Sequence, residues 1–102
     1  MTADRDANES LLASGACIVR VQGWVSAEVG DEMVLMNVAS GRYIGFSETG
    51  KRIWELLPLT LSALCDALAE EYDAAVGDIT ADTITFVHDM LRHDAVALDP
   101  AP

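Results

Sequence analysis

Few side chains in this 102-residue sequence have the types and spacing that catalysis or metal binding needs. Cys17 and Cys65 lack the paired spacing of a zinc or redox site. His88 and His93 are five residues apart, so one face of a helix cannot present both to a metal ion. The run Gly45–Gly50 lacks the Lys-Ser or Lys-Thr ending of a phosphate-binding loop, and no nucleophile elbow occurs. We therefore expect a protein that is not an enzyme and that uses no cofactor.

Charge limits the choice of partner, because 17 acidic residues oppose only 6 basic ones and give a net charge of −11. A nucleic-acid binder neutralises phosphates with Lys and Arg, so nucleic acid is disfavoured as a partner. Basic or neutral partners are favoured, while acidity that serves only solubility accounts for the same count. Because the apolar run at 11–21 is short and broken by Gly15 and Arg20, we expect neither membrane association nor secretion and place the protein in the cytoplasm.

Length and composition indicate one small domain that follows a different kind of segment. Residues 1–17 mix charged and small residues without a period, which predicts a flexible N-terminal arm. Residues 18–99 form the predicted domain, and residues 100–102 form a tail. A function in so small a domain must lie on its exterior rather than in a deep cleft.

The first half of the predicted domain carries the signals of three antiparallel strands. Residues 18–25 form an extended lead-in, and Gly30-Asp31 makes a two-residue turn between strands at 25–29 and 32–38. A short strand at 42–46 follows. No confident strand comes after it, so the strand at 42–46 is an open edge that an extended peptide could join.

Helices are predicted at 47–57 and 60–72, because Ser47 and Thr60 are suited to cap them and apolar residues recur at helical spacing. Expected core residues on these stripes include Gly50, Ile53, Trp54, Leu57, Leu61, Leu64, Cys65, Leu68 and Tyr72. Together with the strands, these helices and a third one farther on predict an α+β fold in which a three-stranded antiparallel sheet precedes three helices.

The third helix is predicted at 80–93, after a break at Gly77 and Asp78 and before an extended segment at 95–98. It is apolar over a wider arc than contact with a core needs. Its two stripes are Ile84, Val87 and Leu91, expected in the core, and Thr83, Phe86 and Met90 beside them. The second stripe serves a partner, or it covers the segment at 96–98.

In their order and spacing these pieces resemble the PqqD-like proteins, also called RiPP recognition elements, over about residues 24–98. The resemblance lies in the strand Glu32–Val38, the turn Ser40-Gly41-Arg42-Tyr43, the junction Phe46-Ser47-Glu48-Thr49-Gly50, the run Ile53-Trp54-Glu55-Leu56-Leu57, the helix Leu64–Tyr72, and Phe86-Val87-x-x-Met90-Leu91 before Ala95-Val96. It implies a winged-helix-like fold. A leader peptide would add as a fourth strand beside the third, in a groove closed by the third helix.

The form of the junction is most similar to the stand-alone proteins of lasso-peptide biosynthesis. These proteins bind the leader of a precursor peptide and present it to a leader peptidase and a cyclase. Carried onto this chain, the resemblance implies that the edge strand supplies main-chain hydrogen bonds, that the third helix supplies apolar pockets, and that Phe86 and Met90 discriminate between peptides. The implied peptide-binding residues are Arg42, Tyr43, Ile44, Gly45, Phe46, Thr83, Phe86, Val87, Met90 and Leu91.

Several alternatives stay open at this point. Asp82 and Asp89 could meet a basic leader residue or only face solvent, and Tyr43 fits a core position as well as a site. The protein could instead be a chaperone for a radical SAM peptide-modifying enzyme. A winged-helix DNA-binding regulator is disfavoured, because Arg92 is the one basic residue beside those carboxylates on the third helix. A homodimer through the open strand edge is a further possibility.

Overall fold

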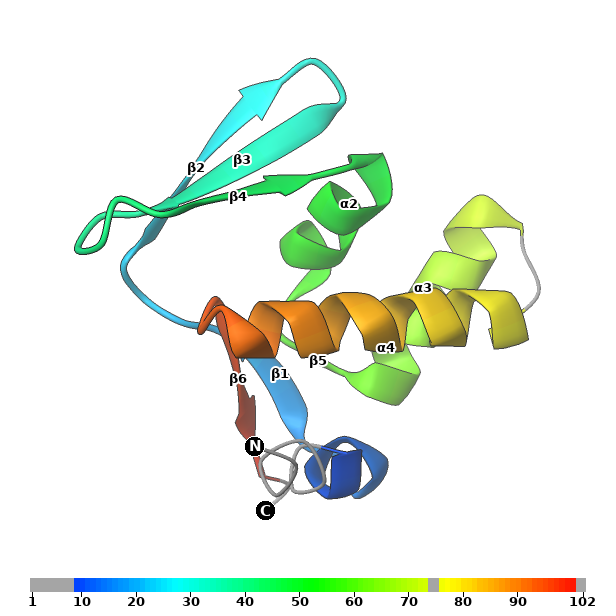
Figure 1. Ribbon diagram of the computed structural model, residues 1–102. Coiled ribbons are helices and arrows are strands. Elements are labelled where there is room, and N and C mark those ends of the chain that lie inside the picture. The colour runs from blue at the N-terminus through cyan, green and yellow to red at the C-terminus, as the bar shows by residue number, and fades with distance from the viewer. Residues whose placement is uncertain (1–8, 74–75, 101–102) are drawn as a thin grey trace.

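Alternating apolar residues build an antiparallel meander in the first half of the chain (Figure 1). The computed structural model describes residues 9–73 and 76–100. The meander consists of β2 (Trp24–Val29), β3 (Glu32–Asn37) and β4 (Tyr43–Phe46). Its strands lie in the order β2-β3-β4, so the three predicted strands and their topology are confirmed.

The hairpin between β2 and β3 turns at the predicted position. Val29 pairs with Glu32 across a two-residue turn, and Gly30 has a φ of +63°, which glycine adopts without steric cost. The inner face of the sheet is buried and apolar, with Leu35 at 0% exposure and Phe46 at 4%. This face covers the core, while the opposite face carries exposed side chains such as Tyr43.

Helix α2 (Glu48–Leu56) begins where the sequence predicts, because the Ser47 side chain accepts a hydrogen bond from the Gly50 amide at 3.4 Å. The helix packs its buried residues, among them Trp54, against the inner face of the sheet. Arg20 holds the other end of the helix, donating to the Trp54 carbonyl at 3.0 Å and 2.6 Å.

Helix α3 (Leu61–Tyr72) is capped by Thr60, whose hydroxyl accepts from the Ala63 amide at 3.2 Å, as predicted. Cys65 is buried in the core, also as predicted. The helix ends at Asp73, which adopts a left-handed conformation.

Helix α4 (Val76–Arg92) begins four residues before the predicted start at 80. Gly77 and Asp78 were expected to break the chain but lie in its first turn. The physical reason is positional, since a residue that weakens a helix interior is tolerated in the first turn, where the Asp78 carboxylate also suits the helix dipole.

A second sheet, not predicted from the sequence, joins the two ends of the chain. It consists of β1 (Cys17–Arg20), β5 (Leu59–Thr60) and β6 (Val96–Asp99), with β1 in the middle. The segment at 95–98, expected to be extended, supplies most of β6, which pairs with β1 in antiparallel register. Residues separated by almost the whole chain therefore lie side by side (Figure 1).

This second sheet corrects the expected flexible arm at 1–17. Residues 9–13 form a short helical turn, Leu12 is 6% exposed, and Ala16 and Ile18 are fully buried. The expected arm is therefore folded from residue 9 onward, and its Leu12 and Ala16 side chains are buried in the core. Residues 1–8 of the expected arm and residues 101–102 of the expected tail lie outside the described residues. No helix in the described ranges is long and apolar enough to span a membrane.

Candidate functional site

The free edge of β4 is the first part of the candidate site. β4 pairs with β3 on one side only, with Leu35 opposite Ile44. The Asn37 amide donates to the Arg42 carbonyl at 2.8 Å. This hydrogen bond fixes which residues of the following strand direct their main-chain groups toward β3. Antiparallel ladders alternate, so Ile44 and Phe46 bond to β3, whereas the amide and carbonyl groups of Tyr43 and Gly45 are directed to the open edge.

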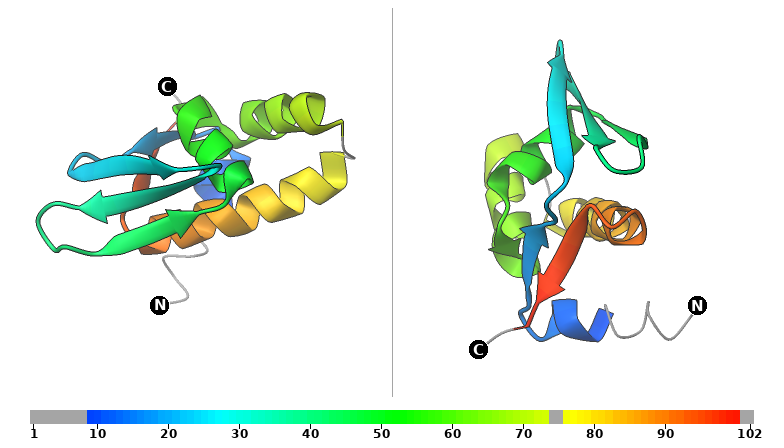
Figure 2. Two further views of the ribbon diagram at one scale, coloured as in Figure 1. Left: turned by 90° about the horizontal axis from the view of Figure 1, so that it is seen from above. Right: turned by 90° about the vertical axis from the view of Figure 1, so that its left-hand side faces the viewer.

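Helix α4 lies alongside this edge and is held at two points (Figures 1 and 2). Near the end of β4, the rings of Phe46 and Phe86 meet edge to face with centroids 5.1 Å apart. At the opposite corner, Trp24 of β2 donates from Nε1 to the Asp94 carbonyl at 3.1 Å, just beyond the end of α4. The helix therefore forms the second wall of a groove whose first wall is β4.

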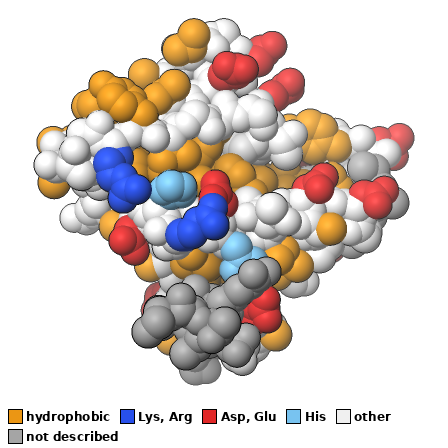
Figure 3. All heavy atoms as spheres, viewed as in Figure 1, with side chains coloured by type: hydrophobic (Ala, Val, Ile, Leu, Met, Phe, Trp, Pro, Cys, Tyr) orange, Lys and Arg blue, Asp and Glu red, His pale blue; other side chains and the backbone are white. Residues whose placement is uncertain are grey.

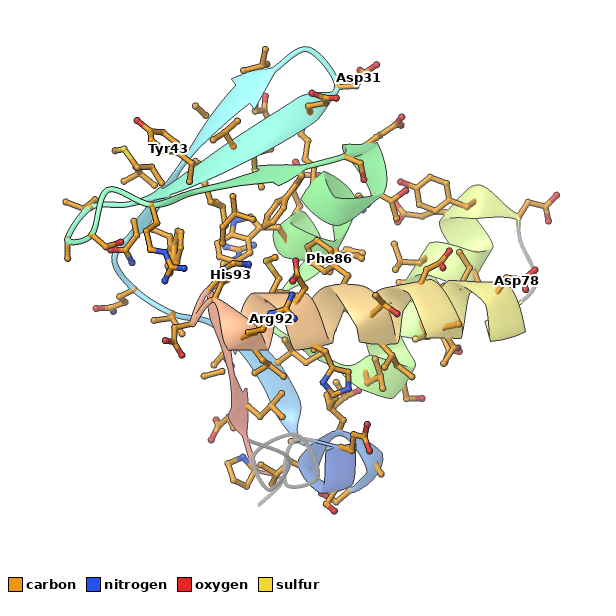
Figure 4. All side chains as sticks on the ribbon, viewed as in Figure 1. Asp31, Tyr43, Asp78, Phe86, Arg92 and His93 are labelled. Atoms are coloured by element: carbon orange, nitrogen blue, oxygen red, sulfur yellow. The ribbon has the colours of Figure 1, made fainter. Side chains whose placement is uncertain are left out.

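A pocket of about 480 Å³ opens where the end of β4 meets the three helices. Phe86 stands at its edge and points toward α2 (Figure 4). A Cβ on Gly50 would lie 2.8 Å from Cε2 of Phe86, so glycine is what lets the ring rest on the α2 backbone. The pocket is lined by Ser47, Thr49, Gly50, Ile53, Leu68, Tyr72, Ile79, Asp82, Thr83 and Phe86.

Charged groups differ between the two ends of the groove. Exposed Asp82 lies at the pocket, and acidic side chains gather around that end (Figure 3). At the other end Arg92 forms an ion pair with Asp89, whose carboxylate is 3.8 Å from His93. Arg42, just before β4, has no ion pair within the described ranges. A peptide laid along the groove therefore meets Asp82 at one end and, at the other, Arg42 together with the Arg92–Asp89 ion pair.

The cations of α2 are already engaged away from the groove. Lys51 contacts Glu28 at 3.1 Å, and their hydrogen bond raises the pKa of Lys51 above its ordinary value. Glu71 does the same to the pKa of Arg52, which it meets at 2.8 Å. No three side chains of His, Cys, Asp or Glu come together as metal ligands in residues 9–73 and 76–100. What the groove offers is main-chain hydrogen bonding and apolar surface.

The structure brings only part of the predicted residue set to the groove surface. Tyr43 and Gly45 bring main-chain groups to the groove, but the Tyr43 side chain, 70% exposed, lies on the opposite face of the sheet. Ile44 and Phe46 face the core. On α4, Phe86 is half-buried and borders the pocket, whereas Leu91, also half-buried, lies on the other flank of the helix. Thr83, Val87 and Met90 are almost completely buried, at 2%, 2% and 1% exposure.

The predicted division of α4 into stripes is therefore corrected. The most buried stripe is Thr83, Val87 and Met90, rather than Ile84, Val87 and Leu91. His88, on the same helical face as Ile84 and Leu91, lies 3.9 Å from Glu9 of the N-terminal helical turn. The apolar arc of α4 is wide because the helix is covered on two sides. The core covers the stripe of Thr83, Val87 and Met90, and the N-terminal helical turn lies beside His88.

Two pocket residues escaped sequence reasoning for identifiable reasons. Ile79 was missed because the third helix was expected to start at residue 80. Tyr72 was assigned to the core stripe of α3, but it lies at the end of that helix and is 39% exposed. A signal for Tyr72 was nevertheless present. An aromatic ring in the last turn of an amphipathic helix lies near the end of the core, where it is less completely covered and can border a surface pocket.

Comparisons with known proteins agree with this geometry. Residues 32–96 match the family model of coenzyme PQQ synthesis protein D (PqqD). Among solved structures, the chain is similar to TbiB1 in complex with the TbiA(beta) leader peptide, with 28% identity and a TM-score of 0.70 over 76% of this chain and 93% of TbiB1. No curated protein matches the chain. Because the family model covers more than half of its residues, the chain belongs to the PqqD family.

Proposed function

We propose that this protein is a non-catalytic adaptor that binds the leader region of a ribosomally synthesised precursor peptide by strand addition to β4. The observation that carries the proposal is an open strand edge beside an apolar helix face, in a PqqD family member similar to a protein bound to a leader peptide. PqqD-like recognition elements are peptide binders without catalytic activity, so the chain is not an enzyme.

Backbone pairing supplies the general affinity in this proposal. Tyr43 and Gly45 each offer one amide and one carbonyl to the incoming strand, which allows up to four hydrogen bonds. Each contributes on the order of 0.5–1.5 kcal/mol net. Main-chain pairing of this kind requires an extended peptide but does not depend on the sequence of that peptide.

Side chains of α4 and the pocket supply discrimination. Alternate residues of an added strand face α4, where Phe86 is half-buried and can be covered further. An apolar or aromatic leader residue near the end of β4 would enter the pocket beside Phe86. In this proposal the buried stripe of α4 acts indirectly, because it anchors the helix in the core and so holds its groove face in place. This stripe consists of Thr83, Val87 and Met90. Asp82 and Asp89 remain candidate contacts for a basic leader residue.

The finer parts of the proposal concern the pathway. We infer that the protein acts in lasso-peptide biosynthesis in the cytoplasm, where it hands the precursor to a leader peptidase and a cyclase. The form of its junction and its similarity to TbiB1 support this inference. Service to a radical SAM enzyme is the alternative. A homodimer through β4 would use the same edge, so added leader peptide should dissociate it in sedimentation experiments.

The test substitutes Gly45 by Pro and measures binding of a synthetic leader, taken from the precursor gene beside this one, by fluorescence polarisation. Proline removes one outward amide without touching the β3–β4 ladder, so affinity should fall about tenfold, or about 1.4 kcal/mol. Gly45→Ala is the matched control, because its Cβ meets nothing within 4 Å and the amide is kept. Equal affinity of the two variants would refute strand addition at this edge.

A further inference from the structure

Two arginines lie at the end of the groove where β4 begins, although the protein has a net charge of −11. Six Lys and Arg residues occur in the chain, and five of them lie in residues 9–73 and 76–100. Three of these five hold main-chain carbonyls or glutamates within the fold, namely Arg20, Lys51 and Arg52. The other two are Arg42 and Arg92. An acidic protein therefore keeps its two remaining cations beside the proposed peptide.

The side chain of Arg42 lies on the inner face of the sheet, which is the face that α4 flanks. Alternate residues of a strand share a face, so Arg42 lies on the same face as Phe46, whose side chain is buried. The pair Trp24–Asn37 continues to Arg42, whose carbonyl accepts from the Asn37 amide. Trp24 in turn donates to the Asp94 carbonyl just beyond α4, so this row of the sheet faces the end of the helix. The exposed Arg42 side chain therefore projects into the end of the groove.

The end of α4 supplies the second cation. Phe86, Asp89 and His93 follow one another at i, i+3 and i+7, so they share the face of α4 that meets Phe46. Asp89 holds Arg92 at this face through one guanidinium nitrogen, Nη2. Because the Arg92 side chain is 75% exposed, its other N–H groups stay accessible to a ligand. Figure 4 places Arg92 and His93 between α4 and the sheet, and Figure 3 shows basic side chains gathered there around an acidic one.

An added antiparallel strand has a defined register against these cations. Its residues opposite Tyr43 and Gly45 make the main-chain hydrogen bonds and project to the outer face of the sheet, on which Tyr43 is exposed. The residues that alternate with them project inward, toward α4. One of these lies opposite Phe46, beside Phe86 and the pocket, and another lies opposite Arg42. Because the two strands run in opposite directions, the residue opposite Arg42 comes four positions after the residue opposite Phe46.

We propose that the start of β4 and the end of α4 form a carboxylate-binding subsite, in which Arg42 and Arg92 hold an Asp or Glu side chain of the leader. This inference rests on the proposed leader-binding function and deepens it, since it names a charged residue and its distance from the apolar one. A guanidinium binds a carboxylate through a fork of parallel N–H groups. Two guanidinium groups against the single carboxylate of Asp89 leave an excess of positive charge for the ligand. The subsite selects a leader with an apolar residue first and an acidic residue four positions later, and it sets the direction of the peptide along β4.

The test is a scan of the synthetic leader in which each position of the paired stretch carries Glu in one peptide and Gln in another, so that the two differ only in charge. Fluorescence polarisation measures binding to the wild-type protein and to Arg42→Gln, Arg92→Gln and Arg52→Gln. The last variant is the matched control, because it removes the same charge from a side chain held by Glu71. Phe86→Ala identifies the leader position at the pocket, because the preference for an apolar residue there should be lost.

We expect one position at which Glu binds about five- to tenfold more tightly than Gln, because hydrogen bonds between charged groups exceed a solvated ion pair. It should lie four residues after the position at the pocket. The preference should shrink to about twofold or less in Arg42→Gln, weaken in Arg92→Gln and persist in Arg52→Gln. It should also weaken when the salt concentration rises from about 0.1 M to about 1 M, which shortens the Debye length from about 10 Å to about 3 Å.

Three results would overturn the subsite. These are equal binding of Glu and Gln peptides at every position, a preference for Glu that persists in Arg42→Gln, and a preference for Lys at the position opposite Arg42, which would assign the contact to Asp89. The comparison of the peptides on the wild-type protein needs no variant, so it decides the matter even if a variant does not fold. Failure of the wild-type protein to bind any of these leaders would instead refute the proposed function.

Discussion

Substitution of Gly50 by Ala should lower both stability and peptide affinity, although the same change in most helices is stabilising. Replacing a helical glycine by alanine normally contributes roughly 0.5–1 kcal/mol. Here the new Cβ would lie 2.8 Å from Phe86 Cε2 and 3.2 Å from Phe46 Cβ. Carbon atoms at optimal separation are about 3.5–4.0 Å apart, so one of these neighbours must move.

The two neighbours differ in how easily they can yield. Phe86 is half-buried and borders the pocket, so its ring can swing outward, whereas Phe46 Cβ is tied to the backbone of β4. Overpacking costs about 1–3 kcal/mol, which exceeds the gain in helix propensity. We expect a net loss of about 1 kcal/mol in the free energy of unfolding and, because Phe86 moves into the space that the leader would occupy, about tenfold weaker binding.

Urea denaturation measures the first effect and fluorescence polarisation with the synthetic leader measures the second. Gly77→Ala is the matched control, since Gly77 lies in the first turn of α4 and an added Cβ meets nothing within 4 Å. This control should gain up to about 1 kcal/mol and keep its affinity. A stabilised Gly50→Ala protein with unchanged affinity would show that Phe86 does not rest on this backbone, and the reasoning would be wrong.

Three further changes separate the core from the groove. Met90→Ala should lower the free energy of unfolding by about 2–5 kcal/mol, measured in urea, and leave the affinity of the folded fraction unchanged, because Met90 is 1% exposed. Phe86→Ala should lose more in leader affinity than in stability; the reverse ranking would mean that Phe86 only covers the core. Arg20→Met should cost about 1–3 kcal/mol of stability, since it leaves the Trp54 carbonyl at the end of α2 without its charged donor, and binding should not change.

Local chemistry made much of the fold predictable. Ser47 and Thr60 cap their helices as expected, and the Gly30-Asp31 turn sets the register of the first hairpin. These signals act within a few residues, so one sequence is enough to recognise them. The edge strand was found for the same reason, since it ends directly at a capped helix.

Features that depend on distant partners were not predictable. The pairing of β1 with β6 joins residues almost at opposite ends of the chain, and nothing local to Cys17–Arg20 specifies it. The start of α4 was misplaced because Gly77 lies in the first turn of the helix, where its weak helix propensity is tolerated. In the candidate site, Met90 was expected either to face a peptide or to cover the segment at 96–98, and the packing of α4 buries it almost completely.

The sequence alone determined the order of the three meander strands and the three main helices, the open edge at β4, the apolar excess of α4 and the family to which the chain belongs. The tertiary structure decided which apolar residues form core and which remain on the groove, the pocket or the outer face. The physical reason is that periodicity fixes which residues share a face of one helix or strand, while only the neighbouring elements decide whether that face is covered.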